Sequence, residues 1–487
     1  MVSPAIRADA TGMRPACAAI TALLFLFAMA SSGEEAPRPN ILFLLADDLG
    51  YGDLGCYGSD VAQSPRLDQL AAQGTRFTQF YVSHCVCSPT RASAMTGQFP
   101  SRHRIFGHLS FLADNKKRHM PDWLRIDAPS LPRALQNAGY RTAMIGKWHL
   151  GGGSGRSFQI SDLKNPTGDF SGRTEILVNH PDAPIVEKYG FHYARTTAGN
   201  GPTWKHLKLW PEPHEIYPYL DQSWVTFSSK AVVDDSIRFL RQHREENADA
   251  PFCLNAWFKD VHTPHAPTAD MLAPFADSPE KERDHYAMVR YMDTQIGRLL
   301  DTLDELELAN DTLVIFSSDN GAGKNRGGSN GPLRGWKHSL YEGGIRVPLV
   351  IRWPGGGVPA RRVDDQSVLN ICDFTPTFCT LAGAKMPAGY ESDGEDVSSA
   401  LQGDSFTRSK RQFWHYPTRS PGLAMRDGDW KLLMDLDGEN LELHNLQSDP
   451  AEENNLSQKK PELAASMKQL LLQWLDEMPT DPLEATE

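Results

Sequence analysis

The sequence predicts an α/β fold in which a large mixed sheet is flanked by helices and followed by a smaller C-terminal α+β domain. Two observations carry this prediction. Apolar segments with the unbroken hydrophobicity of strands buried on both faces occur at residues 40–46, 140–145, 252–258 and 312–317. Helical patterns alternate with them at residues 64–74, 130–139, 228–244 and 283–306. Strands alternating with helices indicate a wound sheet.

The first thirty residues have the composition of a signal peptide. Arg7 and Arg14 supply a basic start, residues 17–29 form an apolar segment, and Ala28-Met29-Ala30 resembles a cleavage site. The apolar segment is short for a membrane span, although a signal anchor is the alternative. We therefore expect an exported protein without a stable membrane span after signal removal. It would be periplasmic or extracellular, or lysosomal in a eukaryotic cell.

Composition excludes several classes of protein. Of 487 residues, 40% are apolar and 23% charged, which is typical of globular chains. The net charge of -12 argues against nucleic acid as a partner, because phosphate backbones require a basic surface. Seven cysteines, of which Cys17 lies in the signal peptide, are too few for a disulfide framework.

Two domains are expected in the mature chain. The main α/β domain spans residues 37–385, and a smaller domain spans 386–487. The smaller domain contains short strand-like segments followed by an amphipathic helix, at residues 423–426, 430–434, 441–445 and 461–478.

Two pairs of polar residues directly follow predicted strands. Asp47 and Asp48 come after the first strand, and Asp319 and Asn320 after the fourth. Ligands of wound sheets bind at the carboxyl ends of the strands. Because these side chains offer only oxygen donors, they suit Ca²⁺ or Mg²⁺ rather than zinc. Either pair alone is equally typical of a turn or a helix cap.

The segment Cys87-Ser-Pro-Thr-Arg91-Ala-Ser-Ala-Met-Thr-Gly97 contains a Cys-x-Pro-x-Arg motif. It resembles the signature of the type I, formylglycine-dependent sulfatases, arylsulfatase-like members of the alkaline phosphatase superfamily. Further segments similar to that family follow in order at residues 46–55, 146–151, 263–267, 318–321 and 337–344. The resemblance covers nearly the whole mature chain and implies the sulfatase fold.

The resemblance also implies a chemistry for Cys87. In this family the motif cysteine is converted to Cα-formylglycine by a maturation enzyme, such as a formylglycine-generating enzyme. The hydrated aldehyde attacks sulfur with one hydroxyl and expels sulfate through the other, so that one difficult step becomes two easier ones. Asp47, Asp48, Asp319 and Asn320, together with the modified Cys87, would hold the metal ion. The family favours calcium, and magnesium is the alternative.

Charged residues of the matching motifs take further roles by resemblance. Arg91 would hold the diol oxygen, whereas its simpler interpretation is an ion pair with a nearby carboxylate. Lys147 and Lys337 would clamp the sulfate oxygens. His149 would remove the proton of the second hydroxyl.

Either a histidine or Lys337 should protonate the leaving alcohol. His265 and His262 compete for this role, since both are followed by x-Pro. We assign it to His265 because only His265 also has a proline directly before it, Pro264. One more polar residue of the sulfate site stays open between Thr196, Thr197 and Asn200.

The sequence therefore predicts a sulfuric ester hydrolase. Its substrate would be a sulfated carbohydrate or an aryl sulfate, with residues 152–184 and 201–222 as rims of the substrate pocket. Two alternatives stay open. One is a phosphonate monoester or phosphodiester hydrolase of the same superfamily, and the other is a non-catalytic binder of sulfated glycans.

Overall fold

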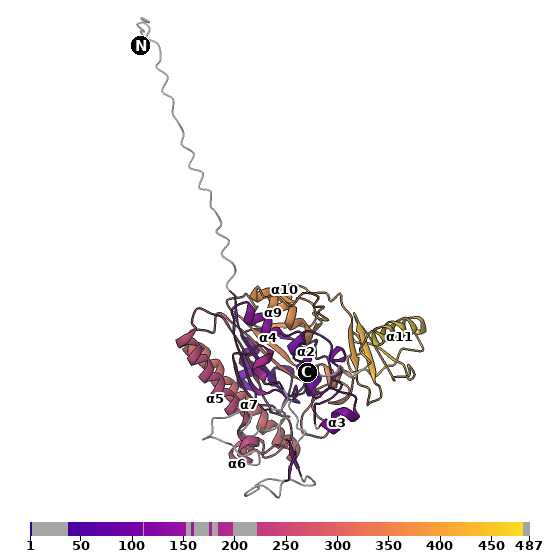
Figure 1. Cartoon of the computed structure of the whole chain (residues 1–487), viewed down its shortest axis with the longest axis horizontal. Coiled ribbons are helices and arrows are strands. Elements are labelled where there is room, and N and C mark those ends of the chain that lie inside the picture. Colours follow the sequence, from indigo (N-terminus) through magenta and orange to yellow (C-terminus); the bar gives the residue numbers. More distant parts are fainter. Residues whose placement is uncertain are drawn as a thin grey trace. The chain divides into compact units, whose positions relative to one another are not determined.

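An eight-stranded sheet forms the centre of the computed structural model (Figure 1). Its strand order is β11-β2-β10-β9-β1-β8-β4-β7, and only β10 runs antiparallel to its neighbours. The strands are β1 (Asn40–Ala46), β2 (Thr75–Phe77), β4 (Arg141–Lys147), β7 (Tyr193–Thr197), β8 (Phe252–Trp257), β9 (Thr312–Ser318), β10 (Leu349–Arg352) and β11 (Arg362–Asp364). The predicted mixed sheet is confirmed.

Apart from Met1, the structure describes residues 38–110, 112–151, 157–159, 175–177, 184–197 and 222–480. The side chains of residues 157–159, 175–177 and 222–225 are not described. The signal peptide lies outside this part of the chain. Nearly all of the two predicted pocket rims lies outside it as well.

Strand β1 shows why its sequence is continuously apolar. Ile41, Phe43 and Leu45 pack into the core on one face of the sheet, whereas Leu42 and Leu44 pack into the core on the other. Alternate side chains of a strand point to opposite faces, so a strand covered on both sides has no polar face. The first face is covered by α2 (Cys87–Thr96), α4 (Leu131–Asn137) and α9 (Phe374–Ala382); the second is covered by α1 (Pro65–Ala72), α5 (Gln222–Glu246) and α7 (Glu280–Glu305).

The C-terminal region contains a four-stranded antiparallel sheet, as predicted. Its strands are β13 (Gln412–His415), β14 (Leu423–Asp427), β15 (Trp430–Met434) and β16 (Glu442–Asn445), and α11 (Pro461–Asp476) packs against them. All described residues from Arg38 onward belong to one compact unit. A domain boundary near residue 385 therefore stays a prediction.

Shorter elements complete the fold. Strands β3 (Phe80–Tyr81) and β12 (Leu369–Asn370) pair in parallel, and β5 (Ser157–Gln159) pairs with β6 (Glu175–Leu177). The short helices are α3 (Leu112–Lys117), α6 (Ala269–Leu272), α8 (Glu342–Ile345) and α10 (Ser398–Leu401). Sequence patterns missed these pieces, together with the short strands β2, β7, β10, β11 and β13, because two to six residues carry too little periodicity.

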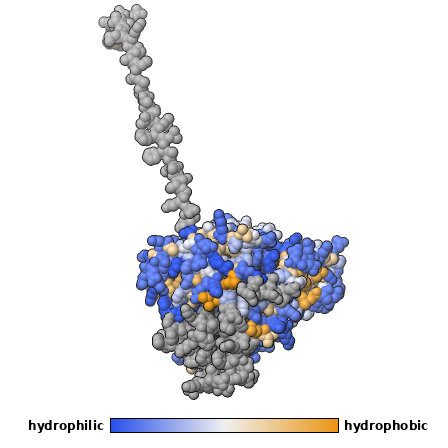
Figure 2. Space-filling model, in the orientation of Figure 1, coloured by the Kyte–Doolittle hydropathy of each residue, from blue (hydrophilic) through white to orange (hydrophobic). Residues whose placement is uncertain are grey.

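The surface drawn in Figure 2 is mostly hydrophilic, with hydrophobic side chains in small, scattered groups. Among the described residues, the large apolar side chains that are exposed lie far apart in the sequence, for example Val61, Ile126 and Val363. Within the same residues, every helix is too short or too polar to cross a lipid bilayer.

Candidate active site

The register of β1 and β9 brings the two polar pairs together. The last residues of these parallel strands lie opposite each other, so the residues that follow leave the sheet at one edge. The Asp48 backbone N–H donates to Asp319 Oδ1 at 3.2 Å, and Asn320 Nδ2 donates to Asp48 Oδ1 at 2.8 Å. Asp47, Asp48, Asp319 and Asn320 are all buried, and we call them the carboxylate cluster.

Cys87 is the first residue of α2 and faces this cluster. Its side chain is buried, with Sγ 3.4 Å from Asp47 Oδ1 and 3.5 Å from Lys337 Nζ. Burial and the negative charge of Asp47 raise the pKa of the Cys87 thiol to about 12. An unmodified thiol at this position would therefore be protonated at neutral pH and a weak nucleophile.

Arg91 lies one helical turn beyond Cys87 and is completely buried. Its Nε and Nη2 donate to Asp319 Oδ2 at 3.0 and 2.6 Å, and its Nη1 donates to the Lys147 carbonyl at 2.7 Å. This is the ion pair that the simpler interpretation of Arg91 expected. It ties α2 to the ends of β9 and β4, and thereby fixes Cys87 relative to the carboxylate cluster.

Two lysines neutralise the first carboxylate pair. Lys147, the last residue of β4, donates to Asp47 Oδ2, and Lys337 Nζ donates to Asp48 Oδ1 at 2.5 Å. Burial acts to raise the pKa of Asp47, but the charges of Lys147 and His262 bring it down to about 2. At Asp48 the charge of Lys337 likewise outweighs burial and lowers the pKa. Both groups are therefore ionised.

The donor set fits a divalent metal ion. Asp47, Asp48, Cys87 and His262 offer ligand atoms within 4.8 Å of one another, and the buried Oδ1 of Asn320 has no hydrogen-bond partner. Ionised oxygen ligands suit a hard cation such as Ca²⁺ or Mg²⁺. The three aspartates of the carboxylate cluster are balanced by three basic side chains. A divalent cation would therefore make the centre positive, which suits an anionic substrate.

His149 lies beside the cluster with one ring nitrogen unpartnered. It follows Lys147 by two residues, its backbone has a φ of 53°, and its side chain is buried. Burial and the charges of Lys147 and Arg91 lower the pKa of His149 well below its ordinary value. Nδ1 is buried and has no hydrogen-bond partner. A neutral imidazole of this kind can accept a proton.

His262, and not His265, lies at the carboxylate cluster. His262 Nε2 is 3.7 Å from Asp48 Oδ2, and the preceding Val261 N–H donates to the Asp47 carbonyl at 2.8 Å. His265 Nε2 instead contacts the Val261 carbonyl at 2.8 Å, and its ring packs against His285 at 5.5 Å. The assignment to His265 therefore does not fit the geometry.

The flanking prolines were a poor criterion for choosing between these histidines. The position relative to the end of β8 was a better signal, because His262 follows Trp257 by five residues and His265 follows it by eight. The backbone of the intervening segment stays hydrogen-bonded to β1 through Val261 and Asp260, which keeps His262 at the sheet edge. Functional side chains of wound sheets occupy this edge.

The choice between Thr196, Thr197 and Asn200 as a further polar residue of the sulfate site stays a prediction. Thr196 and Thr197 end β7, where Thr197 lies opposite Lys147 in the sheet. The Thr196 hydroxyl is buried without a hydrogen-bond partner. Asn200 lies outside the described residues.

Sequence reasoning missed a buried lysine next to the site. Lys259 is 3% exposed, and its Nζ donates to the Pro264 carbonyl at 2.9 Å. Burial lowers the pKa of Lys259, against the charges of Asp260 and Asp47. Its bond to Pro264 fastens the segment that carries His262. No motif marks it, since a lone lysine after a strand is normally exposed.

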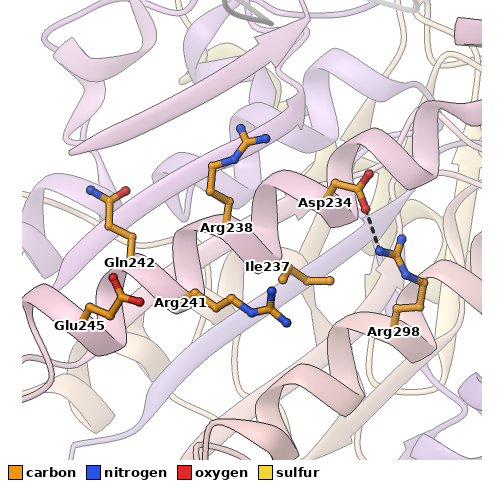
Figure 3. A pocket seen from close by; sticks show the side chains of 7 residues that line it. All are labelled: Asp234, Ile237, Arg238, Arg241, Gln242, Glu245 and Arg298. Carbon is orange, nitrogen blue, oxygen red and sulfur yellow. Dashed lines mark hydrogen bonds and ion pairs between the residues drawn. The ribbon is translucent and has the colours of Figure 1, made fainter. Parts of the chain in front are cut away.

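A groove elsewhere on the molecule has different properties (Figure 3). It lies between α5 and α7, has a volume of about 580 Å³ and presents Arg238, Arg241 and Arg298. Arg298 is 2.8 Å from Asp234, Arg238 pairs with Asp235, and Arg241 is 3.6 Å from Glu305. These charges are exposed and mutually neutralised, so the groove offers no chemistry comparable to the carboxylate cluster.

The fold and the site together define a class of protein. A wound sheet ends in a group of carboxylates that could hold a metal ion, beside buried cations and a helix-borne cysteine, and such a group suits hydrolysis of an oxyanion ester. Residues 39–384 match the sulfatase family, and residues 334–478 match the family described as N-sulphoglucosamine sulphohydrolase, C-terminal. The chain belongs to the sulfatase family and is a sulfuric ester hydrolase.

Individual relatives agree with this assignment. The chain is 32% identical to human arylsulfatase A, over 83% of this chain and 76% of the relative. It is also 32% identical to N-acetylgalactosamine-6-sulfatase of the dog (Canis lupus familiaris), over 79% of this chain and 70% of the relative. The crystal structure of Ps i-CgsB is similar with a TM-score of 0.75 and 25% identity, over 92% of this chain and 94% of that one.

Proposed function

We propose that the chain hydrolyses sulfate esters of a sulfated carbohydrate, using a formylglycine formed from Cys87 and a divalent metal ion. The observation that carries this proposal is the position of Cys87. Its Sγ is 3.4 Å from Oδ1 of Asp47, a member of the carboxylate cluster, and 3.5 Å from the Lys337 ammonium. A modified side chain at this position would meet the metal ligands and a cation together.

The residues of this chain would hold the metal and the modified side chain as follows. Asp47, Asp48, Asp319 and Asn320 supply oxygen ligands, and calcium or magnesium bound there would polarise the sulfate group. A hydrated aldehyde at position 87 would supply one hydroxyl for attack on sulfur and a second for release of sulfate. Arg91 keeps α2 in register with these ligands through its bonds to Asp319.

Four side chains handle charge and protons. Lys147 and Lys337 compensate the sulfate charge as it grows in the transition state. His149, neutral and with an unpartnered Nδ1, accepts a proton from position 87. Either His262, close to Asp48, or Lys337 donates a proton to the leaving oxygen; burial lowers the pKa of His262 to about 4, so it can donate only when the site holds it protonated.

The class of substrate is supported by the relatives. N-acetylgalactosamine-6-sulfatase is named for a sulfated sugar, and Ps i-CgsB has been solved with k-i-k-neocarrahexaose, with a TM-score of 0.73 to this chain. A signal peptide at residues 1–30 is consistent with export to a compartment where sulfated polysaccharides occur.

The test is mass spectrometry of the tryptic peptide Phe77–Arg91 from protein produced in its native host. We expect the mass change that accompanies conversion of the Cys87 thiol to an aldehyde. A thiol in all molecules of an active preparation contradicts the mechanism. Parallel assays of an aryl sulfate and an aryl phosphodiester test the reaction itself, and a large preference for the phosphodiester contradicts the sulfatase activity.

A further inference from the structure

The C-terminal sheet contributes to the region next to Lys337. His338, which follows Lys337, donates its backbone N–H to the Cys85 carbonyl at 3.1 Å. Its ring Nδ1 lies 2.9 Å from the hydroxyl of Tyr416, a buried residue in the turn between β13 and β14. The turn is therefore in direct contact with the segment that carries one of the proposed sulfate-binding lysines.

Arg419 lies in the same turn and is exposed. Its backbone N–H donates to the Tyr416 carbonyl at 3.1 Å, and its side chain hydrogen-bonds the Tyr416 hydroxyl. Burial, followed by the charges of Lys337 and Arg419, lowers the pKa of His338 to about 4. The charges of Arg419 and Lys337 thus act on the same imidazole, so both cations lie near His338.

Among the described residues, the charge of Arg419 is not neutralised by a carboxylate. No described carboxylate lies within ion-pair distance of Arg419 among residues 38–480, whereas Arg411 at the start of β13 is 2.7 Å from Asp427. In a chain with a net charge of -12, an unneutralised arginine beside a buried cationic site is available to an anion. Its tyrosine anchor keeps the guanidinium oriented without removing its charge.

The sulfate group that is cleaved cannot itself account for Arg419. Lys147 and Lys337 already contact the carboxylate cluster beside Cys87, where that group would bind. His338 and Tyr416 connect Lys337 to Arg419, so an alcohol part that extends along them would reach the guanidinium. A cation on this side would meet a second acidic group on the leaving sugar.

We infer that Arg419, held by Tyr416, is a specificity-determining residue that binds a second anionic group, a carboxylate or another sulfate, on the sugar whose sulfate ester is cleaved. The inference rests on the proposed function. It makes the C-terminal sheet a part of the substrate site, and it predicts a preference for polyanionic over singly charged substrates.

The test compares wild type with Arg419→Ala on matched substrates. One pair is a sulfated disaccharide with a free uronic acid and the same compound as its methyl ester; the other is a disulfated and a monosulfated form of one sugar. Arg419→Ala should lower kcat/KM about 10- to 100-fold on the more highly charged member of at least one pair. It should change kcat/KM less than about threefold on 4-nitrophenyl sulfate. The pair that responds identifies the second group.

Arg411→Ala is the matched control, because it removes an exposed arginine of the same hairpin that already has a carboxylate partner. The inference is overturned if Arg419→Ala loses equal activity on the more and the less charged member of each pair. It is also overturned if Arg411→Ala shows the same discrimination. Calorimetric titration with the desulfated uronate product and the monosulfated product decides the subsite without turnover. Equal binding by wild type and Arg419→Ala contradicts it. Failure of wild type to cleave any sulfate ester contradicts the proposed function instead.

Discussion

The molecule contains two buried clusters in which acidic and basic side chains pair, and the two clusters are built differently. The first is the carboxylate cluster with its lysines. The second, which we call the Lys431 cluster, joins the C-terminal sheet to α8 and consists of Tyr81, Glu342, Arg346, Lys431 and Glu452. Lys431 Nζ is 2.9 Å from carboxylate oxygens of both Glu342 and Glu452, and the Tyr81 hydroxyl donates to Glu342 at 2.5 Å.

The two clusters differ in how completely their buried polar atoms are paired within the protein. At the carboxylate cluster, Asn320 Oδ1 and His149 Nδ1 are buried without hydrogen-bond partners, and the oxygen donors face one another. In the Lys431 cluster each charge has a partner of opposite sign: Glu452 Oε1 makes no hydrogen bond but lies 2.9 Å from Lys431 Nζ, and Glu452 also accepts the Glu342 backbone N–H at 2.7 Å. Buried polar atoms without partners are typical of a binding site, whereas buried charges that are all paired within the protein are typical of a structural contact.

The largest expected effect is on the carboxylate cluster. Cys87→Ala removes the proposed nucleophile and should lower kcat by about 10⁴-fold or more. Stability should change little, since the Cys87 thiol makes only long contacts, with Asp47 at 3.4 Å and Lys337 at 3.5 Å. Initial rates on an aryl sulfate and thermal unfolding measure the two effects. Cys85→Ala, which removes a neighbouring buried thiol outside the motif, should remain active; wild-type rates in Cys87→Ala would refute the mechanism.

The next effect separates the two histidines of the 262–265 segment. His262→Ala should lower kcat/KM about 10²- to 10⁴-fold, because it removes the proposed proton donor beside Asp48. His265→Ala should change kcat/KM less than about tenfold, since that ring contacts Val261 and His285 instead. Leaving groups of lower pKa need less protonation, so the loss in His262→Ala should shrink along a series of aryl sulfates. The reverse ranking of the two variants would restore His265.

The choice between His262 and His265 shows which features of the site can be predicted from sequence patterns and which cannot. Strands β1, β4 and β9 were predictable because each is a long, mainly apolar segment; β1 and β9 end just before Asp47 and Asp319, and β4 ends at Lys147. The choice between His262 and His265 depended on where the chain turns after β8, which no periodic pattern encodes. Backbone contacts between neighbouring loops decide such turns.

The Lys431 cluster could not be predicted from the sequence, for a related reason. Glu342, Lys431 and Glu452 are separated by 89 and 21 residues along the chain, and each is unremarkable in its own segment. Only the packing of β15 against α8 makes them neighbours. Arg419 shares this property, because its position beside His338 depends on the packing of the C-terminal sheet against residues 334–346.

Breaking the Lys431 cluster should affect stability more than chemistry. Lys431→Met leaves Glu342 and Glu452 buried and facing each other without their shared cation, which should cost about 3–5 kcal/mol of unfolding free energy. Denaturant unfolding measures this loss, and kcat per folded molecule should fall less than about tenfold. Arg411→Ala, at an exposed ion pair, should cost less than about 1 kcal/mol. Equal stability in wild type and Lys431→Met would show that the Lys431 cluster contributes nothing.

The smallest expected effect is the loss of stability that the Lys431 cluster undergoes at acid pH. Burial acts to raise the pKa of Glu342, but Lys431 and Arg346 outweigh it and lower the pKa to about 2, from an ordinary 4.5. The folded form therefore favours the ionised carboxylate. Its contribution to stability is fully present above about pH 4.5 and is lost as the pH falls toward 2. Burial raises the pKa of Glu452, which opposes this loss.

The net acid effect should therefore be small, of the order of 1 kcal/mol. Denaturant unfolding at intervals from pH 6 to pH 3 measures it, and Glu342→Gln provides the comparison, because an amide cannot titrate. Wild type should lose more stability than Glu342→Gln over this range, with the difference appearing only below about pH 4.5. Parallel pH profiles in the two proteins would mean that Glu342 is not held ionised by Lys431. The Lys431 cluster would then depend on packing rather than on charge.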